Sequence, residues 1–279
     1  MIKVARCGAL ALVLLMCVST IATAQSRSFA EALSAARKDD WGAATRLARG
    51  DTATTYITWM RLREGVGRFS EYSRFLSQNG DWPGLAKLRQ EAERAMPSNL
   101  PAREVVAFFR NAPPETGTGS FRLAAAFKAL GQTNRANATA VEAWLNQPLS
   151  QGAHDAFLGQ FGRALAQHHA ARLDEMLWTG ALQSAEAMLP LVSSAARAVA
   201  VARIRLRRQS SGVDAAISAI PRSRANDPGL AYERFLWRAR KGRTAGAVEL
   251  LEAYSSSAET LGRPQSWSGR RLSIARQLF

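Results

Sequence analysis

The feature that most constrains the fold of this 279-residue chain is a short unit that recurs along it. A turn glycine is followed five residues later by alanine and then by apolar residues. Glycine ends a helix readily because it adopts a left-handed backbone, and alanine lets two helices approach closely. Three copies start at Gly131, Gly180 and Gly242, and looser copies start at Asp39 and Gly212. The starts at Gly180, Gly212 and Gly242 lie 32 and 30 residues apart, close to the period of a tetratricopeptide helix pair.

This repeat predicts an all-α fold, an α-solenoid or superhelix of short, tetratricopeptide-like helix pairs. Other apolar residues also recur at helical spacing, and no stretch alternates as a strand would. Roughly 14 to 16 helices are expected from the turn signals between them. Asp81 and Asp227 each precede a proline and are predicted to cap the start of a helix, whereas Gly50, Gly131 and Gly180 are predicted to follow a helix end. Gly242 is also predicted to follow a helix end.

The first 24 residues have the features of an export signal. Lys3 and Arg6 precede an unbroken apolar run over residues 8–18, which at 11 residues is too short to span a bilayer. The small residues of the triplet 22–24 form the pattern that a signal peptidase cleaves. We therefore predict a signal peptide over residues 1–24 and a periplasmic location for the rest of the chain.

The mature chain predicted over residues 25–279 contains no cysteine, because Cys7 and Cys17 both precede it. This excludes disulfide scaffolds, thiolate metal sites and cysteine nucleophiles. An alternative to cleavage is a lipoprotein attached through Cys17, although Met16 is bulky for the position before a lipid-bearing cysteine. After cleavage we expect no stable membrane insertion.

The charge balance is strongly basic, with 37 Lys+Arg against 22 Asp+Glu and a net charge of +15. Loss of the signal peptide leaves 35 basic residues and a net +13. The densest basic run comprises Arg203, Arg205, Arg207 and Arg208. It is either a solvated helix face or a surface that attracts an anionic extracytoplasmic polymer. Nucleic acid is not an expected partner, because the chain carries an export signal and its aromatic residues lie at helix-core spacing.

No common catalytic or cofactor motif is present, since the chain lacks HExxH, GxSxG, P-loop and GxGxxG patterns. The pair His168-His169 precedes Asp174, but the spacing places His169 and Asp174 on different helix faces, so a solvated or capping histidine pair is expected. Residues 117–120 open a helix and are a candidate for holding an anion, with a plain turn as the alternative. We predict no catalytic, cofactor-binding or metal-binding residue.

Six tryptophans lie in apolar helical windows and are predicted to serve mainly as core. The alternative is that some of them line a surface on which sugars stack. These residues are Trp41, Trp59, Trp82, Trp144, Trp178 and Trp237.

The segment over residues 267–279 is predicted to be the last helix, with its apolar side turned to the core. A solenoid buries each repeat on its neighbour, so a last repeat without a polar cap is expected to fray or to pair with a second copy. The predicted apolar residues are Trp267, Leu272, Ile274, Ala275, Leu278 and Phe279.

Six short strings occur along the chain in the order found in one protein family. They are Asp81-Trp82-Pro83-Gly84-Leu85, Pro113-Pro114-x-Thr116-Gly117-x-Gly119, His169-Ala170-x-Arg172-Leu173-Asp174-x-x-Leu177-Trp178, Ala202-Arg203-Ile204-x-Leu206-Arg207-Arg208, Asp227-Pro228-Gly229-Leu230-Ala231-Tyr232-x-Arg234-Phe235-x-Trp237-Arg238 and Leu261-Gly262-Arg263-Pro264-x-x-Trp267. With them the chain, from about residue 29 to its end, resembles the N-terminal superhelical region of soluble lytic murein transglycosylases. We refer to these six sequence strings as the six family-like strings.

The resemblance implies a superhelical platform in the periplasm that takes part in peptidoglycan turnover. In that family a separate lysozyme-like domain cleaves the glycosidic bond between N-acetylmuramic acid and N-acetylglucosamine, using one glutamate followed by serine as acid and then base. This chain has no Glu-Ser dipeptide and no Gly-Leu-Met-Gln segment of that domain. No catalytic residue can be carried over, and the chain is expected to be a module truncated at its C-terminal end.

Three classes of function follow from the sequence. The first is a non-catalytic superhelical module that binds peptidoglycan and works with its own catalytic domain or with other cell-wall enzymes. The second is a periplasmic helical-repeat adaptor that binds protein partners. The third is an enzyme in its own right, which would use carboxylates such as Glu64 or Glu71.

Overall fold

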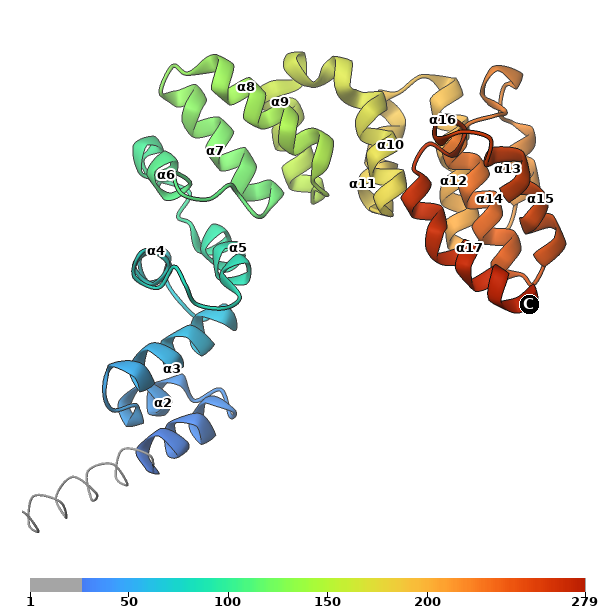
Figure 1. Ribbon diagram of the computed structural model, residues 1–279. Helices are drawn as coiled ribbons and strands as arrows, with labels where there is room; N and C mark the ends of the chain where they lie inside the picture. The colour runs from blue at the N-terminus through green and yellow to red at the C-terminus, as the bar shows by residue number, and fades with distance from the viewer. Residues whose placement is uncertain (1–26, 279) are drawn as a thin grey trace, which may run out of the picture. The chain divides into compact units, whose positions relative to one another are not determined.

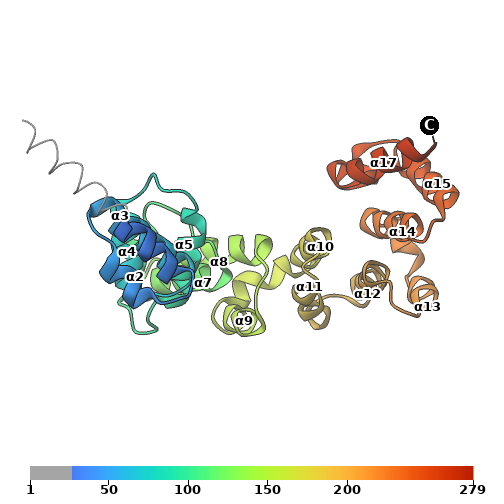
Figure 2. The same cartoon turned by 90° about the horizontal axis from the view of Figure 1, so that it is seen from below.

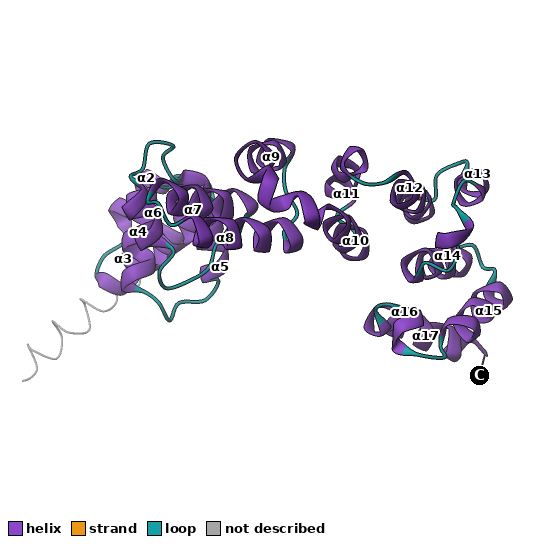
Figure 3. Cartoon of the chain, turned by 90° about the horizontal axis from the view of Figure 1, so that it is seen from above, coloured by secondary structure: helices purple, strands orange, loops and turns teal. Residues whose placement is uncertain are grey.

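The computed structural model describes residues 27–278 of the chain, and no strand occurs among them (Figure 3). The predicted all-α class is therefore confirmed. The predicted signal peptide over residues 1–24 lies outside the described residues, as does Phe279. None of the described helices combines the length and the apolar character needed to cross a bilayer.

The described residues form two compact units. Unit 1 comprises residues 27–104 and 108–115, and unit 2 comprises residues 105–107 and 116–278. The division between them falls within α6 (Ala102–Phe108). The single superhelical domain over residues 25–279 stays a prediction.

Unit 1 consists of short helices that pack in sequence order, coloured blue to teal in Figure 1. One apolar cluster joins the first three helices through Ala32, Ala44 and Ile57. A second cluster joins the last three through Leu62 and Phe75. The helices are 27–36, α2 (Trp41–Leu47), α3 (Asp51–Arg63), α4 (Phe69–Gln78) and α5 (Leu85–Ala95).

Unit 2 is a stack of helix pairs. The pairs are α7 with α8, α10 with α11, α12 with α13, and α14 with α15; α8 also contacts α10, α10 contacts α12, and α12 contacts α14 (Figures 1 and 2). The α-helices are α7 (Gly117–Ala129), α8 (Thr133–Asn146), α9 (Gln151–Leu165), α10 (His169–Thr179), α11 (Leu182–Met188), α12 (Ser194–Arg208), α13 (Val213–Ser218), α14 (Pro228–Arg240), α15 (Thr244–Tyr254), α16 (Ala258–Leu261) and α17 (Pro264–Leu278). Single 3₁₀ turns occur at Ala166–His168, Leu189–Leu191 and Arg222–Arg224.

The repeated turn has one backbone geometry at all five predicted positions. The φ angle is 59° at Asp39, 74° at Gly131, 79° at Gly180, 74° at Gly212 and 70° at Gly242. Four of these residues are glycine because a left-handed backbone brings a Cβ into contact with the main chain, and aspartate is among the few other residues that tolerate it.

The alanine of the repeat is fully buried in four of the five copies, at Ala44, Ala136, Ala185 and Ala247. Each lies on the second helix of a pair, where a small side chain lets that helix approach the first. The fifth, Ala216, is only half-buried. The predicted role of the alanine is therefore confirmed in four copies.

One of the two predicted proline-associated helix starts is wrong. Helix α5 begins at Leu85 and not directly after Asp81, and Gly84 precedes it with a φ of 71°. The Pro83 carbonyl accepts a hydrogen bond, 3.0 Å long, from the indole N–H of Trp59. This contact with α3 stabilises a turn where local preference alone favours a helix.

The second predicted start is confirmed. The Asp227 side chain accepts a hydrogen bond from the Leu230 N–H at 2.9 Å, and α14 begins at Pro228. Gly50 differs from its prediction as well, because it precedes α3 with a φ of 80° and does not directly follow α2, which ends at Leu47.

The last helix, α17, buries only part of the apolar side predicted for it. Trp267 and Ile274 are buried, whereas Leu272 is 54% exposed. Ala275 is exposed too. Fraying or self-pairing of this end stays a prediction.

Candidate functional site

The clearest concave site in unit 2 is a pocket of about 360 Å³ beside Trp178. Its walls come from α10, from α12 and from the start of α14, and the turn before α17 closes one side. A volume of this size lies at the lower end of the range for ligand pockets, about 300–1,000 Å³. We call it the Trp178 pocket. Its polar lining residues are Asp174, Arg203, Arg224, Asp227 and Arg263.

The Trp178 ring is held by contacts from three directions. Tyr232 of α14 stacks on it with ring centroids 5.2 Å apart. The guanidinium groups of Arg203 and Arg263 lie 5.2 and 5.4 Å from its centroid, within the range of a cation–π interaction. The ring is thus a fixed wall of the pocket.

Arg203 is the buried cation of this pocket. Its side chain is 2% exposed, and its Nη1 donates to Asp174 Oδ1 at 2.7 Å. Asp227 Oδ1 lies 4.0 Å from the same nitrogen. Its Nε and Nη2 atoms have no hydrogen-bond partner among the described residues. These counter-ions offset part of the cost of burying the guanidinium, since desolvating a charge is expensive.

Gly229 makes room for this guanidinium. A Cβ at Gly229 would lie 2.2 Å from Arg203 Cζ, far inside van der Waals contact. Any other residue at Gly229 would therefore force the Arg203 guanidinium to move.

Four of the six family-like strings meet at this site. Asp174 and Trp178 come from the third string, Arg203 from the fourth, Asp227 and Gly229 from the fifth, and Arg263 from the sixth. Residues spread over nearly a hundred positions thus make one packed cluster. Arg263, which directly precedes α17, also forms an ion pair with Glu175 of α10, 88 residues away in the sequence.

The predicted basic run is a solvated face only in part, because Arg205 and Arg208 are exposed whereas Arg203 is buried. Besides the buried Arg203, the guanidinium of Arg205 donates to main-chain carbonyls that follow its own helix. Arg208 makes a two-pronged ion pair with Glu186, at 2.6 and 2.9 Å. Arg207 pairs with a buried carboxylate of α14. Three of the four cations pair with carboxylates within unit 2, whereas Arg205 bonds only to uncharged carbonyl oxygens, so the run keeps little uncompensated positive charge beyond Arg205.

That buried carboxylate, Glu233, escaped the sequence analysis. It is almost fully buried, and burial raises the pKa of its carboxyl above the usual value, while Arg207 acts in the opposite direction. Its Oε2 has no partner among the described residues. Glu233 does not line the Trp178 pocket. The sequence gives no sign of this burial, because a single glutamate within a helix is usually exposed to solvent.

The carboxylates predicted as alternative catalytic residues lie in unit 1 and not in this pocket. Glu71 accepts hydrogen bonds from Arg61 at 2.5 Å and from the Arg68 main chain at 2.8 Å. Both bonds, the one to Arg61 first, lower the pKa of Glu71. A general acid needs a raised pKa, so this environment disfavours such a role. Glu64 is exposed at the end of α3.

The predicted histidine pair is split by the fold. His168 precedes α10 without making a side-chain cap, so the capping interpretation is wrong for it. His169 instead packs on Trp144, 5.7 Å between ring centroids, beside the buried Arg172. Asp174 forms its ion pair with Arg203 and not with either histidine. The described residues contain no group of three or more His, Cys, Asp or Glu side chains suited to a metal ion.

Arg172 is the second buried arginine of unit 2. Its Nη1 donates to the carbonyls of Trp144 and Gln147 and so caps the C-terminal end of α8. The guanidinium also lies 4.4 Å from the Trp144 ring centroid. Burial lowers the pKa of Arg172 to about 10.

The histidines around Trp144 predict a pH-dependent stability. Burial, helped by the nearby Arg172 charge, lowers the pKa values of His154 and His169 below 6.5. The unfolded chain then binds more protons than the folded chain below pH 6.5. We expect the free energy of unfolding to fall as pH drops from 7.5 toward 5, and to fall less in a His154→Phe/His169→Phe variant. Urea unfolding at each pH measures both.

Glu233 contributes the opposite slope, because a raised carboxyl pKa makes stability fall as pH rises above 4.5. Both proteins in the histidine comparison keep Glu233, so the difference between their slopes isolates the histidines. Equal slopes would contradict the assignment.

The predicted anion-binding turn is closed. Helix α7 begins at Gly117 as expected, but the Thr116 hydroxyl accepts from the Gly119 N–H at 3.0 Å. A Cβ at Gly117 would lie 2.2 Å from Leu149 Cδ2, so this turn is packed under the loop that follows α8. The turn serves helix packing.

The prediction that the tryptophans are core is only partly confirmed. Of the six, Trp144 is fully buried, while the other five are half-buried. Trp59 and Trp82 pack on each other in unit 1, 5.9 Å between centroids. A seventh, Trp267, is fully buried. Helical spacing marks the inner side of a helix but does not show how deeply a large ring is covered.

Comparison of the chain with protein-family models gives no match, and neither does comparison with curated proteins or with solved structures.

Proposed function

We propose that this protein is a non-catalytic, peptidoglycan-binding helical module of the type found in soluble lytic murein transglycosylases, and that it works in the periplasm. The observation that carries the proposal is the convergence of four family-like strings at the Trp178 pocket. Their convergence supports a shared helical framework.

The stack of helix pairs in unit 2 is consistent with such a framework. The superhelical form of the whole chain, its export and its partnership with a catalytic domain are parts of the same proposal. They follow from the six strings and from the first 24 residues.

A basic patch in unit 2 fits an anionic cell-wall polymer better than the predicted arginine run does. Arg240, Lys241 and Arg243 surround the turn between α14 and α15, and they are exposed. Burial raises the pKa of Tyr232, and the charges of Arg240 and of Arg270, which lies on α17, both act in the opposite direction. None of the four forms an ion pair among the described residues. Guanidinium groups can bind the carboxylates of peptidoglycan stem peptides in two-pronged fashion.

The absence of lytic activity is part of the proposal. The carboxylates lining the Trp178 pocket are both within 4.0 Å of an arginine nitrogen. The raised-pKa carboxyl, Glu233, lies outside that pocket.

Retention on purified sacculi tests the binding. We expect the protein to bind at low salt and to be released between about 0.1 and 1 M salt, since the screening length falls from about 10 to 3 Å. Replacing Arg240, Lys241 and Arg270 with glutamine should weaken retention about tenfold, if each exposed pair contributes about 0.5 kcal/mol.

The matched control removes the same charge from unit 1, with Arg37, Lys38 and Arg46 changed to glutamine. It should weaken retention about twofold at most, because none of these three residues belongs to the basic patch. Equal effects of the two triple variants would refute the basic patch, and no retention at low salt would refute peptidoglycan binding. Anhydro-muropeptide release from sacculi would instead show an enzyme, and capture of a specific protein without sacculus binding would show an adaptor.

A further inference from the structure

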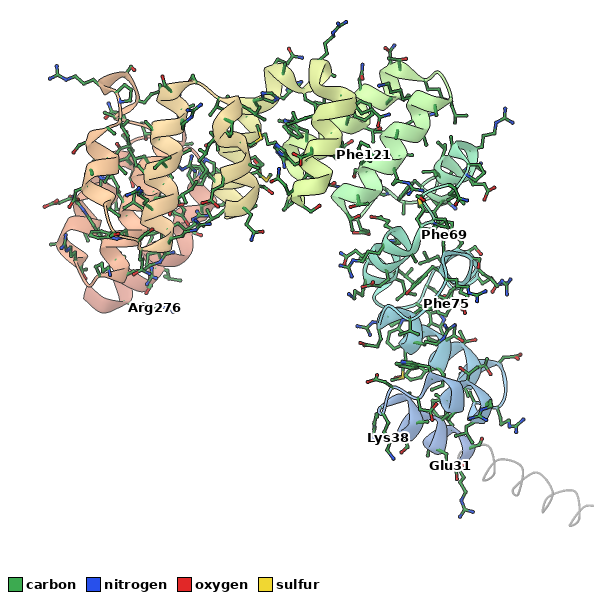
Figure 4. The ribbon with its side chains drawn as sticks, turned by 180° about the vertical axis from the view of Figure 1, so that it is seen from behind. Glu31, Lys38, Phe69, Phe75, Phe121 and Arg276 are labelled. Atoms are coloured by element: carbon green, nitrogen blue, oxygen red, sulfur yellow. The ribbon has the colours of Figure 1, made fainter. Side chains whose placement is uncertain are left out.

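A second pocket lies in unit 1 and shares no lining residue with the Trp178 pocket. It has a volume of about 580 Å³ and is bordered by helix 27–36 and by the first turns of α3. The labelled Glu31 and Lys38 mark this end of unit 1 in Figure 4. Its lining contains an apolar part and a polar part. The lining residues are Phe29, Leu33, Arg49, Asp51, Thr52 and Tyr56.

Tyr56 presents an aromatic ring to solvent here. It is 36% exposed and is the one aromatic side chain among the exposed large hydrophobic residues of the described chain. Its hydroxyl has no hydrogen-bond partner among the described residues. A half-covered ring at the wall of a pocket is a feature of binding surfaces, because it combines apolar area with a polar end.

A row of rings holds Tyr56 in place. Phe29 packs edge-on against it with ring centroids 5.8 Å apart, and the Trp59 ring centroid lies 5.4 Å from that of Tyr56. Trp59 is itself fixed by its hydrogen bond to the Pro83 carbonyl and by Arg63, whose guanidinium lies 4.5 Å from its ring centroid. The ring is therefore pre-oriented, which reduces the entropy lost when a ligand binds.

The polar side of the pocket carries free hydrogen-bonding groups of balanced charge. Arg49, Asp51 and Thr52 are exposed and have no side-chain partner among the described residues. One guanidinium and one carboxylate give no net charge. This distinguishes the pocket from the basic patch, and it favours an uncharged ligand with many hydroxyl and amide groups over a polyanion.

We infer that this pocket, which we call the Tyr56 pocket, is a binding subsite for an N-acetylhexosamine unit of a glycan chain. A pyranose ring offers an apolar C–H face that can lie on Tyr56, while its hydroxyl and acetamido groups can reach Asp51, Thr52 and Arg49. The acetamido methyl group fits the apolar side formed by Leu33. The choice of glycan rests on the proposed function, but the lining itself is independent of it.

The test is binding of chitotetraose, the β-1,4-linked tetramer of N-acetylglucosamine, to protein purified after export. Titration calorimetry gives the affinity, and tryptophan fluorescence reports on Trp59 next to the pocket. Tyr56→Ala should weaken binding at least about tenfold. Tyr56→Phe keeps the ring and should change binding less than about threefold, and Asp51→Asn should weaken it severalfold.

The control Leu272→Ala removes an exposed apolar side chain from unit 2 and should leave chitotetraose binding unchanged. Because the ligand is uncharged, binding should also persist in 1 M salt. No measurable binding by the unchanged protein, or equal binding by Tyr56→Ala and Tyr56→Phe, overturns the subsite.

The two proposals fail separately. Retention on sacculi without chitotetraose binding overturns the Tyr56 pocket and leaves the proposed function standing. Chitotetraose binding without retention on sacculi at low salt overturns the proposed function and keeps the sugar subsite.

Discussion

Replacing Trp267 with alanine is expected to destabilise unit 2 by about 3–5 kcal/mol, the usual cost of removing a fully buried tryptophan. The Trp267 ring stacks on Phe235 with centroids 5.0 Å apart. Its indole N–H donates to the Leu261 carbonyl at 3.0 Å. Truncation therefore leaves a cavity between α14 and α17 and removes one of the two hydrogen bonds to the Leu261 carbonyl, which also accepts from the Arg263 N–H. Urea-induced unfolding followed by circular dichroism measures the loss.

The matched comparison is Trp237→Ala, which removes the same side chain from a half-buried position on α14. Part of the Trp237 ring already contacts water, so a smaller loss of about 1–2 kcal/mol is expected. If the two variants lose equal stability, α17 is not anchored through Trp267 as described.

Replacing Asp174 with alanine is expected to cost about 3 kcal/mol, although the aspartate itself is more than half exposed. The reason is its partner. Arg203 would keep a buried charge whose nearest remaining carboxylate oxygen, on Asp227, is 4.0 Å away. An uncompensated buried cation is costly because the protein interior solvates charge poorly.

Two variants make this prediction specific. Glu186→Ala removes the partner of Arg208 from an exposed pair and should cost less than about 1 kcal/mol. Adding Arg203→Met to Asp174→Ala removes the stranded charge and should recover part of the loss. A double variant less stable than Asp174→Ala alone would show that Arg203 contributes through packing on Trp178 and not through its charge.

The helical pairs could be predicted because their signals are local. A glycine at Gly131 or Gly242 adopts the left-handed backbone through its own lack of a Cβ, and the alanine five residues later fits one helix against the next. Asp227 caps α14 with an atom of its own side chain. Each of these features depends on a few neighbouring residues, so the sequence contains the whole cause.

The arginine run shows where such reasoning stops. Arg203 and Arg208 lie five residues apart on one helix, yet one is 2% exposed and the other pairs at the surface. Which face of α12 meets α10 and α14 decides this, and that choice depends on helices distant in the chain. Asp81 does not cap a helix for a similar reason, because Trp59 of α3 donates a hydrogen bond to the carbonyl of Pro83.

By itself, therefore, the sequence determined the all-α class, the five left-handed turns of the repeat and the small residues between paired helices, all of which follow from local backbone and side-chain preferences. Only the tertiary structure decided which polar groups are buried. It brought Asp174, Arg203 and Asp227 together around Trp178, it buried Glu233, and it left Tyr56 exposed beside three free polar side chains. The physical reason is that burial and electrostatic pairing depend on the atoms a residue meets in space, and those atoms belong to helices far away along the chain.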